Sequence, residues 1–455
     1  MASKPMAPGA AAVSPRARRV TLALLTATYF FSYMDRQILA ILQEDIKADL
    51  MLSDTQLGLL AGFAFALFYA TLGIPVASLA DRTNRRNIIA IALAIWSGAT
   101  AVCGLAANYP QLLAARIGVG IGEAGSSPPS HSMIADMYPP NERASALAIY
   151  SLGVYFGGAG GLILGGNAVE EFGWRAAFFI VGIPGVILAL FVRLFATEPP
   201  RGLSDAKPGV IPATVNEEAA EARPSVMDGF RAMWKSKAAV HLVLAVTLTS
   251  LIGYALTGWT PSFLIRSFGM TPASVGNYYA PLSLVAGAGG VMFSGKLADW
   301  LAKRKGIYAQ AWMVAWLKLA AFPALVLFYF MYDVYTAVAV YLVAHFLQSC
   351  YLGPTFALIQ GLAPVKMRSV WAAISLLVIN LIGLGAGPTL IGVLSDYYAS
   401  NFDVGEESLR WALLTTVMLT PWAIFHYWRA GSLLKTNLDE ERAAAEAAAA
   451  ELGVA

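Results

Sequence analysis

The sequence predicts an all-α integral membrane protein, with twelve transmembrane helices arranged as two pseudo-symmetric bundles of six. Three observations support this fold class: the chain is very apolar, its apolar stretches are long enough to cross a bilayer, and its second half repeats features of its first. Of its 455 residues, 58% are hydrophobic and 13% are charged, whereas soluble domains carry about 25% charged residues. No soluble core needs that much apolar surface.

Composition and polar residues exclude several classes of function. The net charge is only +3, and most charges lie in short runs between apolar stretches, which argues against nucleic-acid binding. Cys103 and Cys350 lie inside apolar stretches, and His131 has no partner at ligand spacing. We therefore expect no metal site, no cofactor, no catalytic residue and no enzyme activity. The Gly-x-x-x-x-Gly-Lys-Ser/Thr loop of an ATP-driven pump is absent from the sequence.

A membrane-spanning helix needs about 20 apolar residues. Twelve stretches qualify, at 20–43, 55–79, 87–107, 111–136, 144–168, 175–196, 238–265, 273–298, 307–331, 334–362, 369–395 and 409–429. The first is too long for a signal-peptide core, so we expect no cleaved signal. The predicted regions are a tail over 1–19, a first bundle over 20–196, a linker over 197–237, a second bundle over 238–430 and a tail over 431–455.

The linker and the C-terminal tail carry the remaining polar sequence. Five prolines argue against a continuous helix through the linker. Its end, 226–237, places Val226, Phe230, Met233 and Trp234 on one face, which predicts a short helix lying on the membrane surface. The Ala-rich tail is a good helix former without an apolar face, and we expect it to be frayed and solvated.

Lysine and arginine counts predict the orientation of the chain. If both termini are cytoplasmic, that side holds 24 of the 31 Lys and Arg residues, the other side holds four, and three lie within spans. The bias predicts cytoplasmic termini.

Internal repetition supports two related halves. The stretch after span two matches the stretch after span eight at an offset of 218 residues, and later pairs have offsets of 225 and 235. The order never breaks, and the offset grows as loop insertions would make it. The matched pairs are Asp81 with Asp299, Arg143 with Arg368, and Arg175 with Arg410.

Four motifs resemble signatures of the major facilitator superfamily. They are Leu79-Ala-Asp81-Arg82-x-x-Arg85-Arg86, its copy around Asp299, the run Arg116-Ile-Gly-Val-Gly120-Ile-Gly122, and Gly173-Trp174-Arg175. The first loop departs from the family pattern, with Ala77 and Asn84 where glycine is usual. More narrowly, Tyr33-Met34-Asp35-Arg36 with Gly120-Ile-Gly122-Glu123-Ala124 is similar to the Spinster branch. The resemblance implies proton-linked movement of lysolipids or sphingoid-type lipids.

Ionisable residues inside apolar helices are the candidate functional residues. Each costs roughly 2.5 to 3.5 kcal/mol at the bilayer centre, so they must face a cavity or one another. Arg116 and Glu123 lie two turns apart on one face of span four, and Asp35 and Arg36 lie in span one at a depth between them, so all four could line one cleft. An Asp35–Arg116 ion pair could simply join the spans. Alternatively, Asp35 and Glu123 carry protons, while Arg36 and Arg116 bind the substrate head group.

The second half has aromatic and polar residues but only one full charge within its spans, Lys318, for which snorkelling and a cavity role are both open. Packing explains most such residues as well as binding does. A charged first half and an aromatic second half would suit an amphipathic solute. The predicted substrate contacts of the later spans are Tyr254, Trp259, Tyr279, His345 and Asn380.

The repeated loops predict a cytoplasmic gate. Ion pairs and helix-end contacts there can hold the inner side shut while the outer side is open. The predicted gating residues are Asp81, Arg85, Arg143, Asp299 and Arg368.

Together these features predict a proton-coupled secondary transporter that works by alternating access on a lysophospholipid or sphingoid lipid. A transporter of a drug, organic acid or sugar is the alternative, and so is a transport-dead sensor on the same fold. We expect a monomer in the bacterial cytoplasmic membrane, whose partners are the bilayer and a small amphipathic molecule. No nucleic-acid partner is expected.

Overall fold

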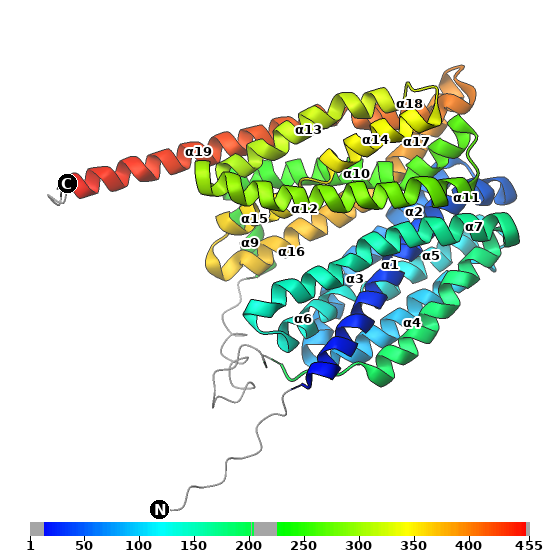
Figure 1. Ribbon diagram of the computed structural model, residues 1–455, viewed down its shortest axis with the longest axis horizontal. Coiled ribbons are helices and arrows are strands. Elements are labelled where there is room, and N and C mark those ends of the chain that lie inside the picture. Colours follow the sequence, from blue (N-terminus) through cyan, green and yellow to red (C-terminus); the bar gives the residue numbers. More distant parts are fainter. Residues whose placement is uncertain (1–12, 202, 204–224, 452–455) are drawn as a thin grey trace, which may run out of the picture. The chain divides into compact units, whose positions relative to one another are not determined.

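The computed structural model describes residues 13–201, 203 and 225–451, and these residues form helices and no strand (Figure 1). They divide into two compact units. The first comprises the described residues of 1–52, 64–222 and 271–280, and the second comprises those of 53–63, 223–270 and 281–455. The all-helical class predicted from the sequence is confirmed.

The first unit contains the helices of predicted spans one to six. They are α1 (Pro15–Leu50), α3 (Phe63–Arg82), α4 (Arg85–Cys103), α5 (Tyr109–Glu123), α6 (Ser127–Met137) and α7 (Pro140–Phe195), with α11 (Pro272–Ser274) and the π-helix η1 (Val275–Tyr279). Helix α7 covers two predicted spans, which are joined by a kink at Gly173, where φ of 80° and ψ of 164° are not helical. Only glycine adopts this conformation at low cost, and the kink falls at the boundary predicted between spans five and six.

The second unit contains the remaining helices. They are α2 (Asp54–Ala61), α9 (Val226–Lys235), α10 (Lys237–Phe268), α12 (Ala280–Lys305), α13 (Tyr308–Phe328), α14 (Val334–Gln348), α15 (Leu352–Leu362), η2 (Val365–Met367), α16 (Arg368–Val378), η3 (Ile379–Ala386), α17 (Gly387–Asn401), η4 (Gly405–Glu407), α18 (Ser408–Val417) and α19 (Thr420–Glu451). Helix α9 lies within 226–237, where the sequence predicts a short helix, and the side chain of Ser225 caps it. The Ala-rich tail, expected to fray, instead continues α19 as helix to Glu451.

Helix α2 belongs to the second unit because polar contacts tie its first turn there. The Asp54 carboxylate accepts two hydrogen bonds of 2.7 Å from Arg266 of α10 and one of 2.6 Å from Ser395 of α17. The Asp396 carboxylate accepts from the backbone N–H groups of Asp54 and Thr55. These first-turn N–H groups have no partner within a helix, so a carboxylate is well placed there.

In the part of the chain that the structure describes, seven helical stretches are long and apolar enough to cross a membrane. Predicted spans one, four, eight and twelve are not among them. Spans one and four hold Asp35, Arg36, Arg116 and Glu123. Span four is divided between α5, with 15 residues, and α6, with 11, and neither is long enough by itself.

Close packing in the first unit depends on small residues where α7 crosses α1. A Cβ atom on Gly157 would lie 2.2 Å from the backbone oxygen of Phe30, and one on Gly161 would lie 2.5 Å from that of Met34. Glycine at both positions therefore lets the two backbones approach within contact distance.

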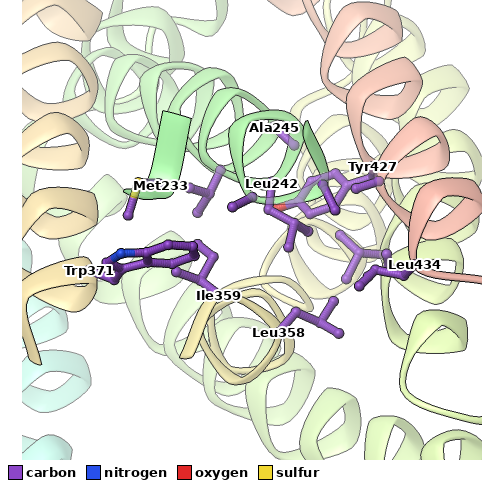
Figure 2. Close-up of a cluster of buried hydrophobic side chains, with 14 of the residues drawn as sticks. Met233, Leu242, Ala245, Leu358, Ile359, Trp371, Tyr427 and Leu434 are labelled. Atoms are coloured by element: carbon purple, nitrogen blue, oxygen red, sulfur yellow. The ribbon is translucent and has the colours of Figure 1, made fainter. Parts of the chain in front are cut away.

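An apolar core joins the helices of the second unit (Figure 2). Leu242 of α10, Ile359 of α15 and Trp371 of α16 are each at most 2% exposed, and Tyr427 of α19 packs with them. The Tyr427 hydroxyl lies 2.9 Å from the Thr355 hydroxyl, so its polar end is satisfied inside the core.

Candidate functional site

Helix α1 places three polar side chains within two turns, at Ser32, Asp35 and Arg36. Asp35 is 2% exposed. Its Oδ2 accepts a short hydrogen bond from the Thr100 hydroxyl of α4. A hydroxyl can donate to a carboxylate and can accept from a carboxylic acid, so this contact suits both protonation states.

Glu123, the last residue of α5, provides the second buried carboxylate of the site. The helix ends there, and α6 restarts at Ser127 with prolines in its first turn. The Glu123 Oε1 accepts from the Ser32 hydroxyl and from Arg36 Nε at 2.9 Å, and Arg36 Nη2 lies 2.8 Å away. Glu123 is 1% exposed, so this is a buried ion pair between α1 and α5.

Aromatic rings surround the Arg36 guanidinium. Its central carbon lies 5.0 Å from the ring centroid of Tyr33 and 4.9 Å from those of Phe65 and Tyr69. The Arg116 guanidinium lies 5.6 Å from the same Phe65 ring. Ring faces attract cations, so the rings stabilise both arginines without neutralising them.

Several buried atoms of this site have no hydrogen-bond partner among the described residues. They are Asp35 Oδ1, Glu123 Oε2, and Nε and Nη1 of Arg116. Buried polar atoms are normally paired. The two carboxylate oxygens are places for a proton, and the Arg116 nitrogens are donors for an anion.

The simplest pairing expected from the sequence is an ion pair between Asp35 and Arg116, and the structure pairs the charges differently. Arg36 and Glu123 form the ion pair, whereas Asp35 and Arg116 interact only at longer range. Ser32 and Thr100 were not among the residues predicted from the sequence. Ser32 lies one helical turn before Arg36, which is a usable signal, but nothing in the sequence marks Thr100.

The predicted aromatic and polar contacts do not gather in one unit. Tyr279 is buried in the first unit, whereas the other four belong to the second. Trp259 is fully buried, and its Nε1 donates to the Pro388 oxygen at 2.9 Å, which is a packing role. Tyr254, His345 and Asn380 are half-buried.

Arg85 is the best-connected of the predicted gating residues. It is 1% exposed and forms an ion pair with Asp136 and another of 2.7 Å with Glu198. It also donates to the Ser132 hydroxyl and the Pro199 oxygen, both at 2.8 Å. Asp136 and Glu198 had not been predicted, because the sequence pattern directs attention to Asp81.

The other predicted gating residues lie near the ends of helices. The side chain of Asp81 lies outside the described residues, although its backbone ends α3. Arg143 Nε donates to the Tyr138 oxygen at 3.4 Å. Asp299 and Arg368 are exposed, and the described side chains include no ion pair between them.

A family model described as the Major Facilitator Superfamily matches residues 25–388. The chain belongs to the major facilitator superfamily. An "MFS-type efflux pump" of Mycolicibacterium smegmatis is 33% identical over 429 residues, which are 94% of this chain and 96% of that protein. The zebrafish (Danio rerio) "Sphingosine-1-phosphate transporter SPNS2" is 25% identical, over 91% of this chain and 83% of its own length.

A solved structure extends the comparison to the Spinster branch. It is the crystal structure of a bacterial homologue of the human lysosomal transporter Spinster, in an inward-facing and unoccupied conformation. The match has a TM-score of 0.79 and 30% identity, and it covers 92% of this chain and 98% of that one. This major facilitator protein is therefore an integral membrane transporter of the Spinster branch with a twelve-helix architecture, and not an enzyme. Members of the superfamily generally need no bound cofactor.

Proposed function

We propose that this protein is a proton-coupled secondary transporter of an amphipathic solute and works by alternating access. The observation that carries the proposal is the pair of buried carboxylates, Asp35 and Glu123, each with one oxygen held by a hydroxyl and the other without a partner among the described residues. A carboxylate buried in this way can change its protonation when its surroundings change.

The two carboxylates have different roles in this proposal. Glu123 is held in a buried ion pair with Arg36. Among the described residues, Asp35 has the Thr100 hydroxyl as its hydrogen-bond partner and no ion pair at contact distance, so it is the better proton carrier. A proton on Asp35 removes the negative charge that attracts Arg116.

Arg116 couples the proton to the solute. An arginine keeps its proton and can grip a carboxylate or phosphate through two parallel hydrogen bonds. When Asp35 is ionised it competes for Arg116 with the anionic group of a solute, and when Asp35 is protonated the competition ends. Protonation and head-group binding therefore favour each other, which is the requirement for coupled transport.

A lysophospholipid or sphingoid lipid is the proposed substrate class. The similarity to a protein named as a sphingosine-1-phosphate transporter supports a lipid. The similarity to a protein named as an efflux pump supports the alternative, export of a drug-like solute. The count of Lys and Arg residues supports cytoplasmic termini, and the bacterial relatives support the cytoplasmic membrane.

Proteoliposome flux tests the proposal. A pH gradient should drive uptake of a labelled lysophospholipid by the wild type, and Asp35→Asn should abolish the gradient-driven part while solute exchange remains. Asp49→Asn is the matched control on the same helix, because Asp49 is 44% exposed and its contacts lie at the surface: an ion pair with Arg175 and a hydrogen bond of 3.3 Å from Trp174 Nε1. Wild-type uptake without any response to the gradient would contradict proton coupling.

A further inference from the structure

The second unit contains one buried ammonium group, Lys318 of α13, which is 1% exposed. Its Nζ donates to Gln348 Oε1 at 2.6 Å and lies 4.8 Å from the ring centroid of Tyr351. An amide oxygen and the face of an aromatic ring both stabilise a cation. Gln348 and Tyr351 therefore both offer contacts that stabilise the charged form of Lys318.

The cation lacks the counter-charge that a buried cation normally has. Within the part of the chain that the structure describes, no ion pair includes Lys318. In the first unit, by contrast, Arg36 pairs with Glu123, and Arg116 acts on Asp35 at longer range. The two arginines there have two carboxylates nearby, whereas the described residues provide no carboxylate for the positive charge of Lys318.

The cluster also has more donors than acceptors. A lysine ammonium has three N–H groups, and one of them is directed to Gln348. Because Gln348 Oε1 accepts this bond, the amide is oriented with Oε1 toward the lysine. Gln348 Nε2 is buried and has no partner among the described residues. The Tyr351 hydroxyl lies 3.3 Å from that of Ser250, which orients the tyrosine from α10.

Gln348 and Tyr351 are half-buried, although Lys318 behind them is buried. Both residues therefore keep part of their surface exposed beside the buried lysine. His345, one turn before Gln348 in α14, is also half-buried. Gly287 of α12 lies so close to this ring that a Cβ atom there would be 2.9 Å from His345 Nε2, so α12 packs directly against the histidine.

We propose that Lys318, Gln348 and Tyr351 form a binding site in the second unit for the anionic group of a solute, a phosphate or a carboxylate. The inference rests on the proposed transport function and adds a second cationic contact to Arg116. The lysine supplies the charge, the Gln348 amide supplies a directed donor, and the tyrosine ring holds the ammonium in place. The anion completes the charge balance that the described residues leave open.

Equilibrium binding to the purified full-length protein, without any gradient, tests the site. The probes are oleoyl lysophosphatidate with uncharged monooleoylglycerol, and D-glucuronate with D-glucose, so that a lipid phosphate and a small carboxylate are distinguished. We expect at least one anionic probe to bind more tightly than its neutral partner. Lys318→Met should weaken that probe by about tenfold to a hundredfold, the range for a charged hydrogen bond, and should leave the neutral partner unchanged.

Gln348→Glu provides a variant that is not expected to misfold. The new carboxylate lies beside Lys318 and supplies the counter-charge, so the variant should unfold at a higher temperature than the wild type and yet lose the preference for the anionic probe. Lys235→Met, on the exposed side of α9, is the matched control and should bind like the wild type.

Three results would overturn the site: no preference of the wild type for either anionic probe, equal losses for charged and neutral probes in Lys318→Met, or retained anion binding in Gln348→Glu. None of them depends on a proton gradient. Intact anion binding combined with gradient-independent flux would instead contradict the proposed coupling and leave the site standing.

Discussion

The energetic weight of a charge in this protein depends on its burial. Arg36 and Arg18 both lie on α1, and each forms an ion pair with a glutamate. The Arg36 and Glu123 side chains are 13% and 1% exposed, whereas those of Arg18 and Glu142 are 26% and 49% exposed. Removing one partner from a buried pair leaves a charge that is not compensated, while a surface pair contributes little.

Glu123→Ala should therefore destabilise the protein strongly. The loss should be about 3 kcal/mol, because the variant leaves the Arg36 guanidinium buried without its carboxylate. Glu142→Ala should change stability by less than about 1 kcal/mol. Thermal unfolding in detergent measures both, and similar shifts for the two variants would show that burial does not set the energy of these pairs.

Arg85 offers a second test, because its contribution to stability depends on the geometry of its hydrogen bonds as well as on its charge. Its guanidinium contacts Asp136, Glu198 and two further oxygen atoms at once. A lysine keeps the charge but not the planar fork of donors. Arg85→Lys should lower stability by roughly 2 kcal/mol, the range for lost charged hydrogen bonds.

Arg82→Lys is the control for Arg85→Lys. Arg82 is exposed at the end of α3, so the substitution should leave the unfolding temperature and the transport rate unchanged. An unchanged unfolding temperature in Arg85→Lys would mean that its contacts contribute little to the folded state.

The charged residues of the site could be predicted from the sequence because charge inside an apolar helix is expensive and therefore conspicuous. The hydroxyl groups of Ser32 and Thr100, which contact these charges, do not stand out in the sequence in this way. Ser and Thr are common in membrane helices and often bond to their own backbone, as Thr100 also does with the Trp96 oxygen at 3.0 Å. The Arg36–Glu123 pairing was missed for a different reason, since depth along a helix does not give its rotation.

At the scale of helices, small residues decide which contacts are possible. Gly157 and Gly158 are neighbours in α7, but they face different surroundings. A Cβ atom on Gly157 would overlap the Phe30 backbone oxygen at 2.2 Å, whereas on Gly158 the nearest atom is Gln37 Cγ at 3.8 Å. The same substitution at these two positions therefore separates helix packing from helix propensity.

Gly157→Ala should destabilise the protein by about 1 to 3 kcal/mol, the usual cost of overpacking. Gly158→Ala should be neutral or stabilising by up to about 1 kcal/mol, since alanine favours helix more than glycine does. Unfolding temperatures of both variants in the same detergent make the comparison. A loss in Gly158→Ala as large as that in Gly157→Ala would contradict the packing argument.

Helix positions could be predicted from the sequence, and helix interruptions could not. The structure divides predicted span two between α2 and α3 at Gly62, and predicted span four between α5 and α6 after Glu123. The π-helical turns η1 and η3 interrupt predicted spans eight and eleven. Hydropathy averages over about 20 residues and cannot locate such breaks, which depend on local backbone hydrogen bonds.

At the scale of the whole molecule, the repeat in the sequence predicted two six-helix halves, and the compact units follow them only in part. Residues 53–63 belong to the second unit and residues 271–280 to the first. Asp54 explains the first exchange through its contacts with Arg266 and Ser395. Glu170 contributes to the second, because its carboxylate accepts from the Ala273 backbone N–H at 2.7 Å. Such polar contacts between distant parts of the chain leave no periodic signal in the sequence.

Orientation in the membrane is the last prediction, and the two buried cysteines make it easy to test. With cytoplasmic termini, the connection between spans eight and nine faces the cytoplasm and the next connection faces outward. Ile307 is 52% exposed in the first and Tyr332 is fully exposed in the second. A membrane-impermeant maleimide should label Tyr332→Cys in intact cells and Ile307→Cys only after lysis. The opposite pattern would require the excess of Lys and Arg to lie outside, against the charge rule for membrane insertion.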